Sequence, residues 1–175
     1  MKIALLSDSH TKVEATQEAL AFLRDQGASF IIHAGDLVDP QNLELLAATQ
    51  MRYIAVYGNN DAHLVEYAHN YNLVQEPYYF KLADTKCKLM HLPLYLTPDA
   101  ELVIFGHTHQ FEVMQKSGTL YINPGEICAR NKPYSECALL EIQEEAFCVD
   151  YYTKGSEDLA YRLQEHYEFK RQKHE

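Results

Sequence analysis

The segment Ile104–His109 places two histidines directly after a short apolar run and a glycine. Residues two apart on an extended backbone point the same way, so His107 and His109 would present both imidazoles on one side. Gly106 would let the backbone turn there or let another group approach closely. Ligands bind at the carboxyl ends of strands in open α/β sheets, so a metal-binding pair is one interpretation. A strand that simply ends in polar turn residues is the other.

The same residue types follow several other predicted strands. They are Asp8 and His10 after residues 2–6, Asp36 after 30–32, Asn59 after 53–57, and His91 at the end of 87–92. Each cluster alone has a structural explanation as a turn, a helix cap or a core histidine. Neighbouring parallel strands end side by side, however, so these clusters would converge on one crevice. Five turns that use Asp, Asn or His, and neither Lys nor Arg, favour a common site.

The number of candidate ligands indicates how many metal ions the site would hold. Four imidazoles, two carboxylates and one amide oxygen make seven ligands, whereas one ion takes about four to six. Two ions roughly 3.5–4 Å apart that share a carboxylate would use seven and hold a bridging water or hydroxide. Mixed nitrogen and oxygen ligands suit Mn, Fe, Zn, Co or Ni better than Ca or Mg.

The first half of the chain alternates strands and helices. Strands are expected at 2–6, 30–32 and 53–57, with helices at 11–26 and 42–49, which predicts a parallel α/β sheet. The second half is rich in strands. Three hairpins are expected, at 78–82 with 87–92, at 111–115 with 119–122, and at 136–142 with 146–152, and a single strand at 102–105. These strands favour a second, mostly antiparallel sheet, so that two sheets with helices outside form a layered sandwich.

The last twenty residues, 156–175, have the pattern of a helix. Ser156 could cap it, and Leu159, Leu163 and Tyr167 form an apolar stripe at a spacing of four. We therefore expect a domain of residues 1–155 and a helical extension of residues 156–175. The extension would pack on the domain or serve for association with a partner or a second copy.

The bulk composition limits the class of protein. The chain has 175 residues, of which 47% are hydrophobic and 23% charged, as in a soluble single domain. Its formal net charge of −10 argues against long nucleic acids as partners. Four cysteines without C-x-x-C spacing indicate free thiols, and no apolar run approaches the ~20 residues of a membrane span. A soluble cytoplasmic protein is expected.

The order of these motifs resembles the calcineurin-like metallophosphoesterase superfamily. The chain carries Asp-x-His, Gly-Asp, Gly-Asn-x-Asp, a single His and Gly-His-x-His in that order between residues 2 and 142. It is most similar to the small, single-domain bacterial and archaeal phosphodiesterases of that group, whose late loop resembles residues 123–126. The tail lies outside the resemblance. The resemblance implies a four-layer αββα sandwich, in which two mixed β-sheets are flanked by helices.

The resemblance also assigns a role to each candidate ligand. It implies a first metal held by Asp8, His10 and His109, a second held by Asn59, His91 and His107, and a bridge through Asp36. A hydroxide between two divalent ions would attack phosphorus in line, with Mn²⁺ the expected metal and Fe, Zn, Co or Ni the alternatives. Metal affinity should fall in acid, because the carboxylates must be ionised and the histidines neutral.

Two features depart from the family pattern. Asn60 stands where many members have a histidine that helps to protonate the leaving group or to stabilise the phosphate, and an amide cannot supply a proton. Asn60 and the adjacent Asp61 remain the candidates for catalytic roles, Asp61 as an orienting group or merely a cap. Only 14 residues separate His91 from Gly106, so this loop is shortened and could displace His91.

We therefore expect a dinuclear metal-dependent phosphodiesterase that acts on a small phosphate ester. The alternative is a non-catalytic protein-interaction scaffold, since the retromer scaffold subunit has the same fold. A nuclease is disfavoured by the acidic charge, no membrane association is expected, and self-association is left open. His33 is expected in the core or beside the ligands, and Cys128 as a buried, unreactive thiol.

Overall fold

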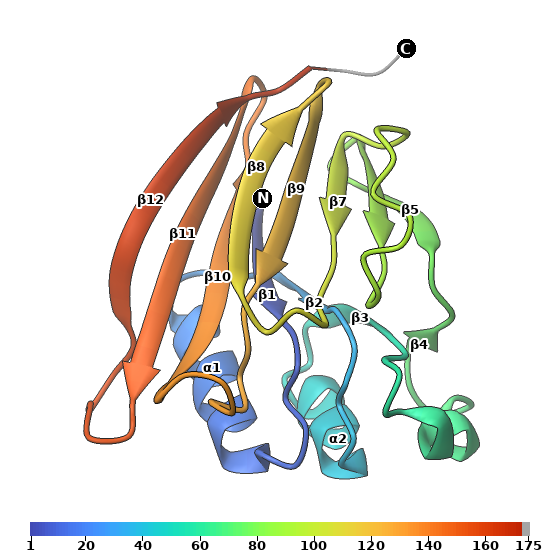
Figure 1. Ribbon diagram of the computed structural model, residues 1–175, viewed down its shortest axis with the longest axis vertical. Helices are drawn as coiled ribbons and strands as arrows, with labels where there is room; N and C mark the ends of the chain where they lie inside the picture. Colours follow the sequence, from blue (N-terminus) through green and yellow to red (C-terminus); the bar gives the residue numbers. More distant parts are fainter. Residues whose placement is uncertain (173–175) are drawn as a thin grey trace.

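A computed structural model describes residues 1–172 as two facing sheets with helices on one side (Figure 1). The first sheet has the order β12-β11-β10-β1-β2-β3-β4 and the second the order β5-β6-β7-β9-β8. The strands of the first sheet are β1 (Lys2–Leu6), β2 (Phe30–His33), β3 (Arg52–Val56), β4 (Leu73–Val74), β10 (Tyr134–Ile142), β11 (Ala146–Gly155) and β12 (Arg162–Lys170). Those of the second are β5 (Tyr78–Leu82), β6 (Thr85–Leu89), β7 (Leu102–Ile104), β8 (Phe111–Lys116) and β9 (Thr119–Pro124).

The predicted parallel α/β unit forms the middle of the first sheet. Strands β1 to β4 run parallel, with α1 (Val13–Asp25), α2 (Pro40–Ala48) and the 3₁₀ helix η1 (Ala62–Tyr67) between them. Alternate residues of β1 face opposite sides, because a strand has a side-chain period of two. Ile3 and Leu5 pack against the second sheet, whereas Ala4 and Leu6 pack under the helices. Both faces of β1 are therefore buried.

The three predicted hairpins are confirmed, but they do not all belong to one sheet. The third, β10–β11, joins the first sheet, where β10 pairs antiparallel with β1. The first two, β5–β6 and β8–β9, flank β7, which runs parallel to β6 and β9. The expectation of a mostly antiparallel second sheet was wrong, and both sheets are mixed, as the family resemblance implies.

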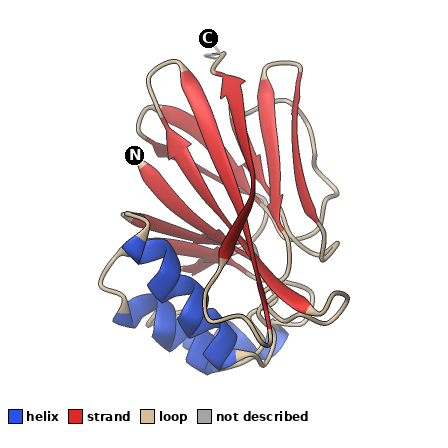
Figure 2. Ribbon diagram, turned by 90° about the vertical axis from the view of Figure 1, so that its left-hand side faces the viewer, coloured by secondary structure: helices blue, strands red, loops and turns tan. Residues whose placement is uncertain are grey.

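The outer layers of the sandwich differ. The helices cover part of the first sheet, and its strands extend well beyond them (Figure 2). The outer face of the second sheet packs instead against the loop of residues 90–101, through Met90 and Ala100. The fully buried Lys88 anchors this loop, since its ammonium lies 2.6 Å from Asp99 and donates to the carbonyl of Tyr95. In the described part of the chain, no helix is both long and apolar enough to cross a membrane.

The tail corrects our prediction of a helix. Residues 162–170 form β12, an antiparallel strand paired with β11 along its length. Tyr167 and Phe169 pack against the core between the sheets, whereas Leu159 is fully exposed. A spacing of four residues fits both periods, because residues four apart also share one face of a regular strand. Residues 173–175 of the predicted extension lie outside the described residues.

Candidate metal centre

The turns after five strands, β1, β2, β3, β6 and β7, bring the predicted ligands together. The turns after β1 and β2 are joined by a hydrogen bond from the Asp8 amide to the Gly35 carbonyl, at 3.0 Å. The second sheet joins them, since the amide of His107 donates to Oδ2 of Asp8 at 3.1 Å. Asn59 follows β3, the next parallel strand. The carboxyl ends of these strands therefore meet in one place, as predicted.

The backbone at these turns is unusual. Five of the seven predicted ligands have φ between +48° and +69°, a region that residues other than glycine rarely adopt. They are Asp8, His10, Asp36, His107 and His109. Such strain concentrates at functional sites. The backbone geometry also corrects one expectation. His107 and His109 lie on a turn rather than on an extended backbone, and their side chains face two different groups of ligand atoms.

The first group of ligand atoms surrounds Asp8. Nε2 of His109 lies 3.2 Å from Oδ1 of Asp8 and 3.4 Å from Nε2 of His10. Asp8 is fully buried, and its Oδ1 has no hydrogen-bond partner among the described residues. A buried carboxylate oxygen without a partner costs free energy, and a cation at this point would satisfy it. The residues present therefore fit a metal ion.

The second group of ligand atoms surrounds the side-chain oxygen of Asn59. This oxygen lies 2.9 Å from Nε2 of His91 and 3.0 Å from Nδ1 of His107. Asp36 lies between the two groups, with Oδ1 3.5 Å from Nε2 of His91 and Oδ2 3.6 Å from Nε2 of His10. One carboxylate thus presents a different oxygen to each group.

His91 reaches the site despite its shortened loop. Its backbone amide and that of Leu92 both donate to the carboxylate of Glu76. Its Nδ1 lies 2.8 Å from the carbonyl oxygen of Ala34 and must donate to it, which leaves Nε2 free for a metal. Gly35 permits this approach, because a Cβ there would lie 2.7 Å from the ring nitrogen.

Asn60 and Asp61 have different hydrogen-bond partners. The backbone and side-chain amides of Asn60 donate to the two oxygens of Asp36, at 3.0 and 2.8 Å. The buried carboxylate of Asp61 accepts from three backbone amides, of Leu37, Val38 and Gly58. Asp61 therefore holds two ligand-bearing turns together. Asn60 is placed to orient Asp36, and the catalytic roles expected of Asn60 and Asp61 stay predictions.

Comparison with known proteins agrees with this arrangement. Residues 1–145 match the calcineurin-like phosphoesterase superfamily domain. The chain belongs to this superfamily. It is 28% identical to a curated phosphodiesterase of Methanocaldococcus jannaschii, over 73% of this chain and 85% of that protein.

Solved structures of other proteins are similar as well. An archaeal phosphodiesterase superposes with a TM-score of 0.72 at 25% identity, over 94% of this chain and 99% of the other. Vacuolar protein sorting 29 of Cryptosporidium parvum superposes with a TM-score of 0.73 at 17% identity, over 97% of this chain and 98% of the other. The second likeness concerns the fold alone.

Glu126 is a residue of this phosphoesterase site whose role sequence reasoning missed. Its Oε2 lies 2.5 Å from Nδ1 of His109, and its Oε1 accepts from the amides of Asn131 and Lys132. Burial alone would raise the pKa of Glu126, but these hydrogen bonds outweigh it and hold the pKa below its ordinary value. An ionised carboxylate behind Nδ1 fixes the tautomer that leaves Nε2 of His109 free. The sequence feature that could have indicated this role is the position of Glu126 in the late loop, residues 123–126.

The protonation states also suit a phosphoesterase metal centre. Burial lowers the pKa of His10, and the Arg130 charge lowers it further. Burial opposes ionisation of Asp36, but His91 and the amides of Asn60 outweigh it and lower its pKa. Burial raises the pKa of Asp8, and the Ser7 hydroxyl and the nearby histidines oppose this shift. His10 and Asp36 thus hold the neutral and ionised forms that ligands need.

Two neighbours of the ligands have structural roles. His33 is fully buried, with Nε2 2.7 Å from the Ser9 hydroxyl, and burial lowers its pKa to about 3. Cys128 donates to Glu126 at 3.4 Å, and burial raises the pKa of its thiol to about 12. The thiol is therefore unreactive, which agrees with our prediction.

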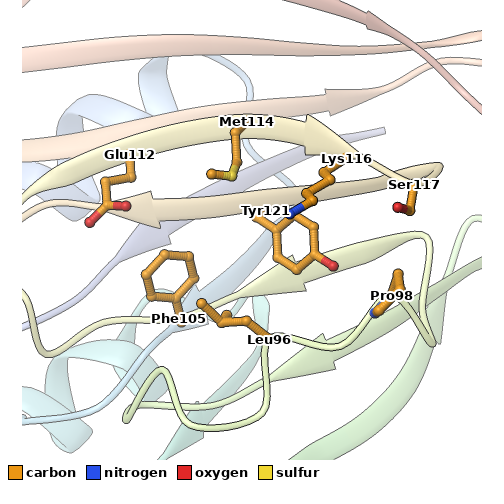
Figure 3. Close-up of a pocket in the computed structure, with 8 residues that line it drawn as sticks. All are labelled: Leu96, Pro98, Phe105, Glu112, Met114, Lys116, Ser117 and Tyr121. Carbon is orange, nitrogen blue, oxygen red and sulfur yellow. The ribbon is translucent and has the colours of Figure 1, made fainter.

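A separate cavity of about 300 Å³ lies on the outer face of the second sheet. Its walls include Leu96, Phe105, Met114 and Tyr121, with the charged Glu112 and Lys116 on β8 (Figure 3). None of the seven predicted ligands lines it. This apolar cavity is therefore not the place where a phosphate group would bind.

Proposed function

We propose that the protein is a dinuclear metal-dependent phosphodiesterase that acts on a small phosphate ester. The observation that carries the proposal is the position of Asp36, whose two oxygens face two separate groups of ligand atoms. The unpartnered buried oxygen of Asp8 supports a cation in the first group. Membership of the superfamily and the likeness to a curated phosphodiesterase support the reaction class.

Bound divalent ions, with Mn²⁺ our expectation, would supply positive charge for the phosphate oxygens and a water acidic enough to attack phosphorus near neutral pH. The residues of the chain hold the geometry in which this happens. Asn60 fixes the plane of Asp36, and Glu126 fixes the tautomer of His109. Since Asn60 cannot supply a proton, the reaction should favour esters with good leaving groups.

Arg130 is our candidate for binding the substrate phosphate. This exposed residue donates from Nη2 to Nδ1 of His10 at 3.1 Å. A neutral imidazole that accepts at Nδ1 carries its proton on Nε2 and cannot bind a metal there. Metal binding by His10 therefore requires Arg130 to move away. Its guanidinium would then be free, beside the metal centre, to form a bidentate pair with a phosphate.

An activity assay tests the proposed function. The purified protein, stripped with a chelator and reloaded with Mn²⁺, should hydrolyse an activated aryl phosphodiester. Asp36→Ala should reduce the rate to background, whereas Asp25→Ala, which removes an exposed carboxylate on α1, should leave it unchanged. Hydrolysis by Asp36→Ala at the wild-type rate would overturn the mechanism.

The second candidate function is a non-catalytic scaffold, which the likeness to vacuolar protein sorting 29 favours. A scaffold has no physical need for seven convergent metal-ligating side chains. The assay separates the two functions, because a scaffold could bind metal but would not turn over the diester.

A further inference from the structure

A second group of metal-ligating residue types lies on β11 and β12, away from the strand ends that carry the metal centre. Ligand atoms of Cys148, His166 and Glu168 all lie within 4.8 Å of one another. The register pairs Cys148 with Glu168 and Asp150 with His166. Directly paired residues on antiparallel strands share a face, so these four side chains form one block.

The block lies on a free part of the sheet. Phe147 and Val149 face the core, so Cys148 and Asp150 face the side on which the helices pack. Strand β11 begins and β12 ends at the end of the sheet farthest from the helices (Figures 1 and 2). Cys148 is partly buried, whereas His166 and Glu168 are exposed. The donor atoms are therefore accessible from solvent.

The charges around Cys148 favour a cation. Its neighbour on β12 is Glu168, its neighbour on β10 is Glu141, and Asp150 is two residues further along β11. Within residues 1–172, neither Glu141 nor Glu168 forms an ion pair. The nearest cationic residues in the strand register are Lys2, beside Glu141, and Lys170, beyond Glu168. Neither forms an ion pair with these two carboxylates, and the Lys2 ammonium donates to the carbonyl of Gln26 instead. Carboxylates grouped in this way repel one another unless a cation lies between them.

His166 is held as a metal-ligating histidine would be. Its Nδ1 lies 2.6 Å from Oδ1 of Asp150. A carboxylate on one ring nitrogen fixes the tautomer and leaves the other nitrogen as a ligand, which is the arrangement behind most metal-bound histidines. Asp150 would thus be a positioning residue, with His166 the ligand.

We propose that Cys148, His166 and Glu168 form a zinc-type metal site, independent of the metal centre. Sulfur, nitrogen and oxygen donors together suit Zn²⁺, and three protein ligands leave the fourth position to water or to Glu141. Binding releases the thiol proton of Cys148 to solvent, so affinity rises with pH. A metal here ties β12 to β11 and so stabilises the edge strand of the first sheet.

Cobalt spectroscopy on the full chain tests the site, because a thiolate bound to Co²⁺ gives a charge-transfer absorption in the near ultraviolet. The wild-type protein, freed of metal and titrated with Co²⁺, should show this band, and Cys148→Ser should lose it. Cys128→Ser is the matched control, because Cys128 lies beside His10 and His109 and is the cysteine nearest to the other metal centre. This variant should keep the band. Loss of the band in Cys128→Ser but not in Cys148→Ser would overturn the proposal, as would no band at all.

The other ligands give a second readout that does not depend on a cysteine variant. His166→Ala and Glu168→Gln should weaken competition for Zn²⁺ against a chelating dye, and Asp150→Asn should weaken it by about 10-fold to 100-fold. Zn²⁺ should also slow amide hydrogen exchange in β12 of the wild type. Unchanged zinc affinity in His166→Ala, with a folded protein by circular dichroism, would contradict the proposal.

Discussion

Single residues of the metal centre differ in how far they were predictable. Asp8 and Asp36 follow buried strands within a few residues, so their convergence follows from parallel pairing alone. Glu126 lies 17 residues from His109 in the sequence, and only the folded chain brings the two side chains together. Ligands at strand ends are thus local features, whereas the residue that orients a ligand depends on the tertiary fold.

Replacing Glu126 should weaken metal binding. Glu126→Gln removes the charge behind Nδ1 of His109 and should lower Mn²⁺ affinity by about 10-fold to 100-fold. A competition titration against a chelator measures this. Asp25→Asn, which removes the charge of an exposed carboxylate on α1, is the control and should retain wild-type affinity. Equal affinities in Glu126→Gln and the wild type would exclude the orienting role.

Replacing Arg130 should separate substrate binding from metal binding. Arg130→Gln should raise KM for the diester by about 10-fold, the scale of one charge-assisted hydrogen bond. Metal affinity should stay equal or increase, because the competing hydrogen bond to His10 is removed. A fall in metal affinity with unchanged KM would show that Arg130 supports the ligands instead.

At the scale of helices and strands, local patterns predicted most elements, but neither the sheet that each hairpin joins nor the structure of the tail. The strand–helix alternation and the three hairpins could be predicted from the sequence, because each gives a local pattern of apolar residues and turn residues. The sheet that each hairpin joins could not be predicted from the sequence, because β10 pairs with β1 across more than a hundred residues. The tail was misassigned because a four-residue spacing suits a helix and a strand alike, and pairing with β11 decides between them.

The turn after β7 should not tolerate a side chain at Gly106. A Cβ there would overlap the Ser7 hydroxyl and lie 2.6 Å from the carbonyl oxygen of Ala34. Gly106→Ala should therefore lower the free energy of unfolding by about 1–3 kcal/mol and reduce metal binding. Urea unfolding measures the first effect. Gly155→Ala, whose new Cβ would meet mainly the side chain of Asp158, should cost less; equal losses would refute the close-packing argument.

At the scale of the whole molecule, the buried His33 links stability to pH. The folded protein keeps His33 neutral with a pKa of about 3, whereas the unfolded chain titrates near 6.5. Between these values the unfolded state binds more protons, so stability falls as the pH falls, by up to about 1.4 kcal/mol per pH unit. His33→Gln should flatten this dependence in urea unfolding of the metal-free protein from pH 6.5 downward. An equally steep dependence would contradict the assignment.

Electron paramagnetic resonance of the Mn²⁺-loaded protein is the sharpest test of whether two metal ions share Asp36. Two ions bridged by one carboxylate should be magnetically coupled, so the wild type should give an exchange-coupled spectrum. Asp36→Ala should lose that coupling. A wild-type spectrum that shows only isolated Mn²⁺ ions at full loading would contradict a carboxylate shared by two ions.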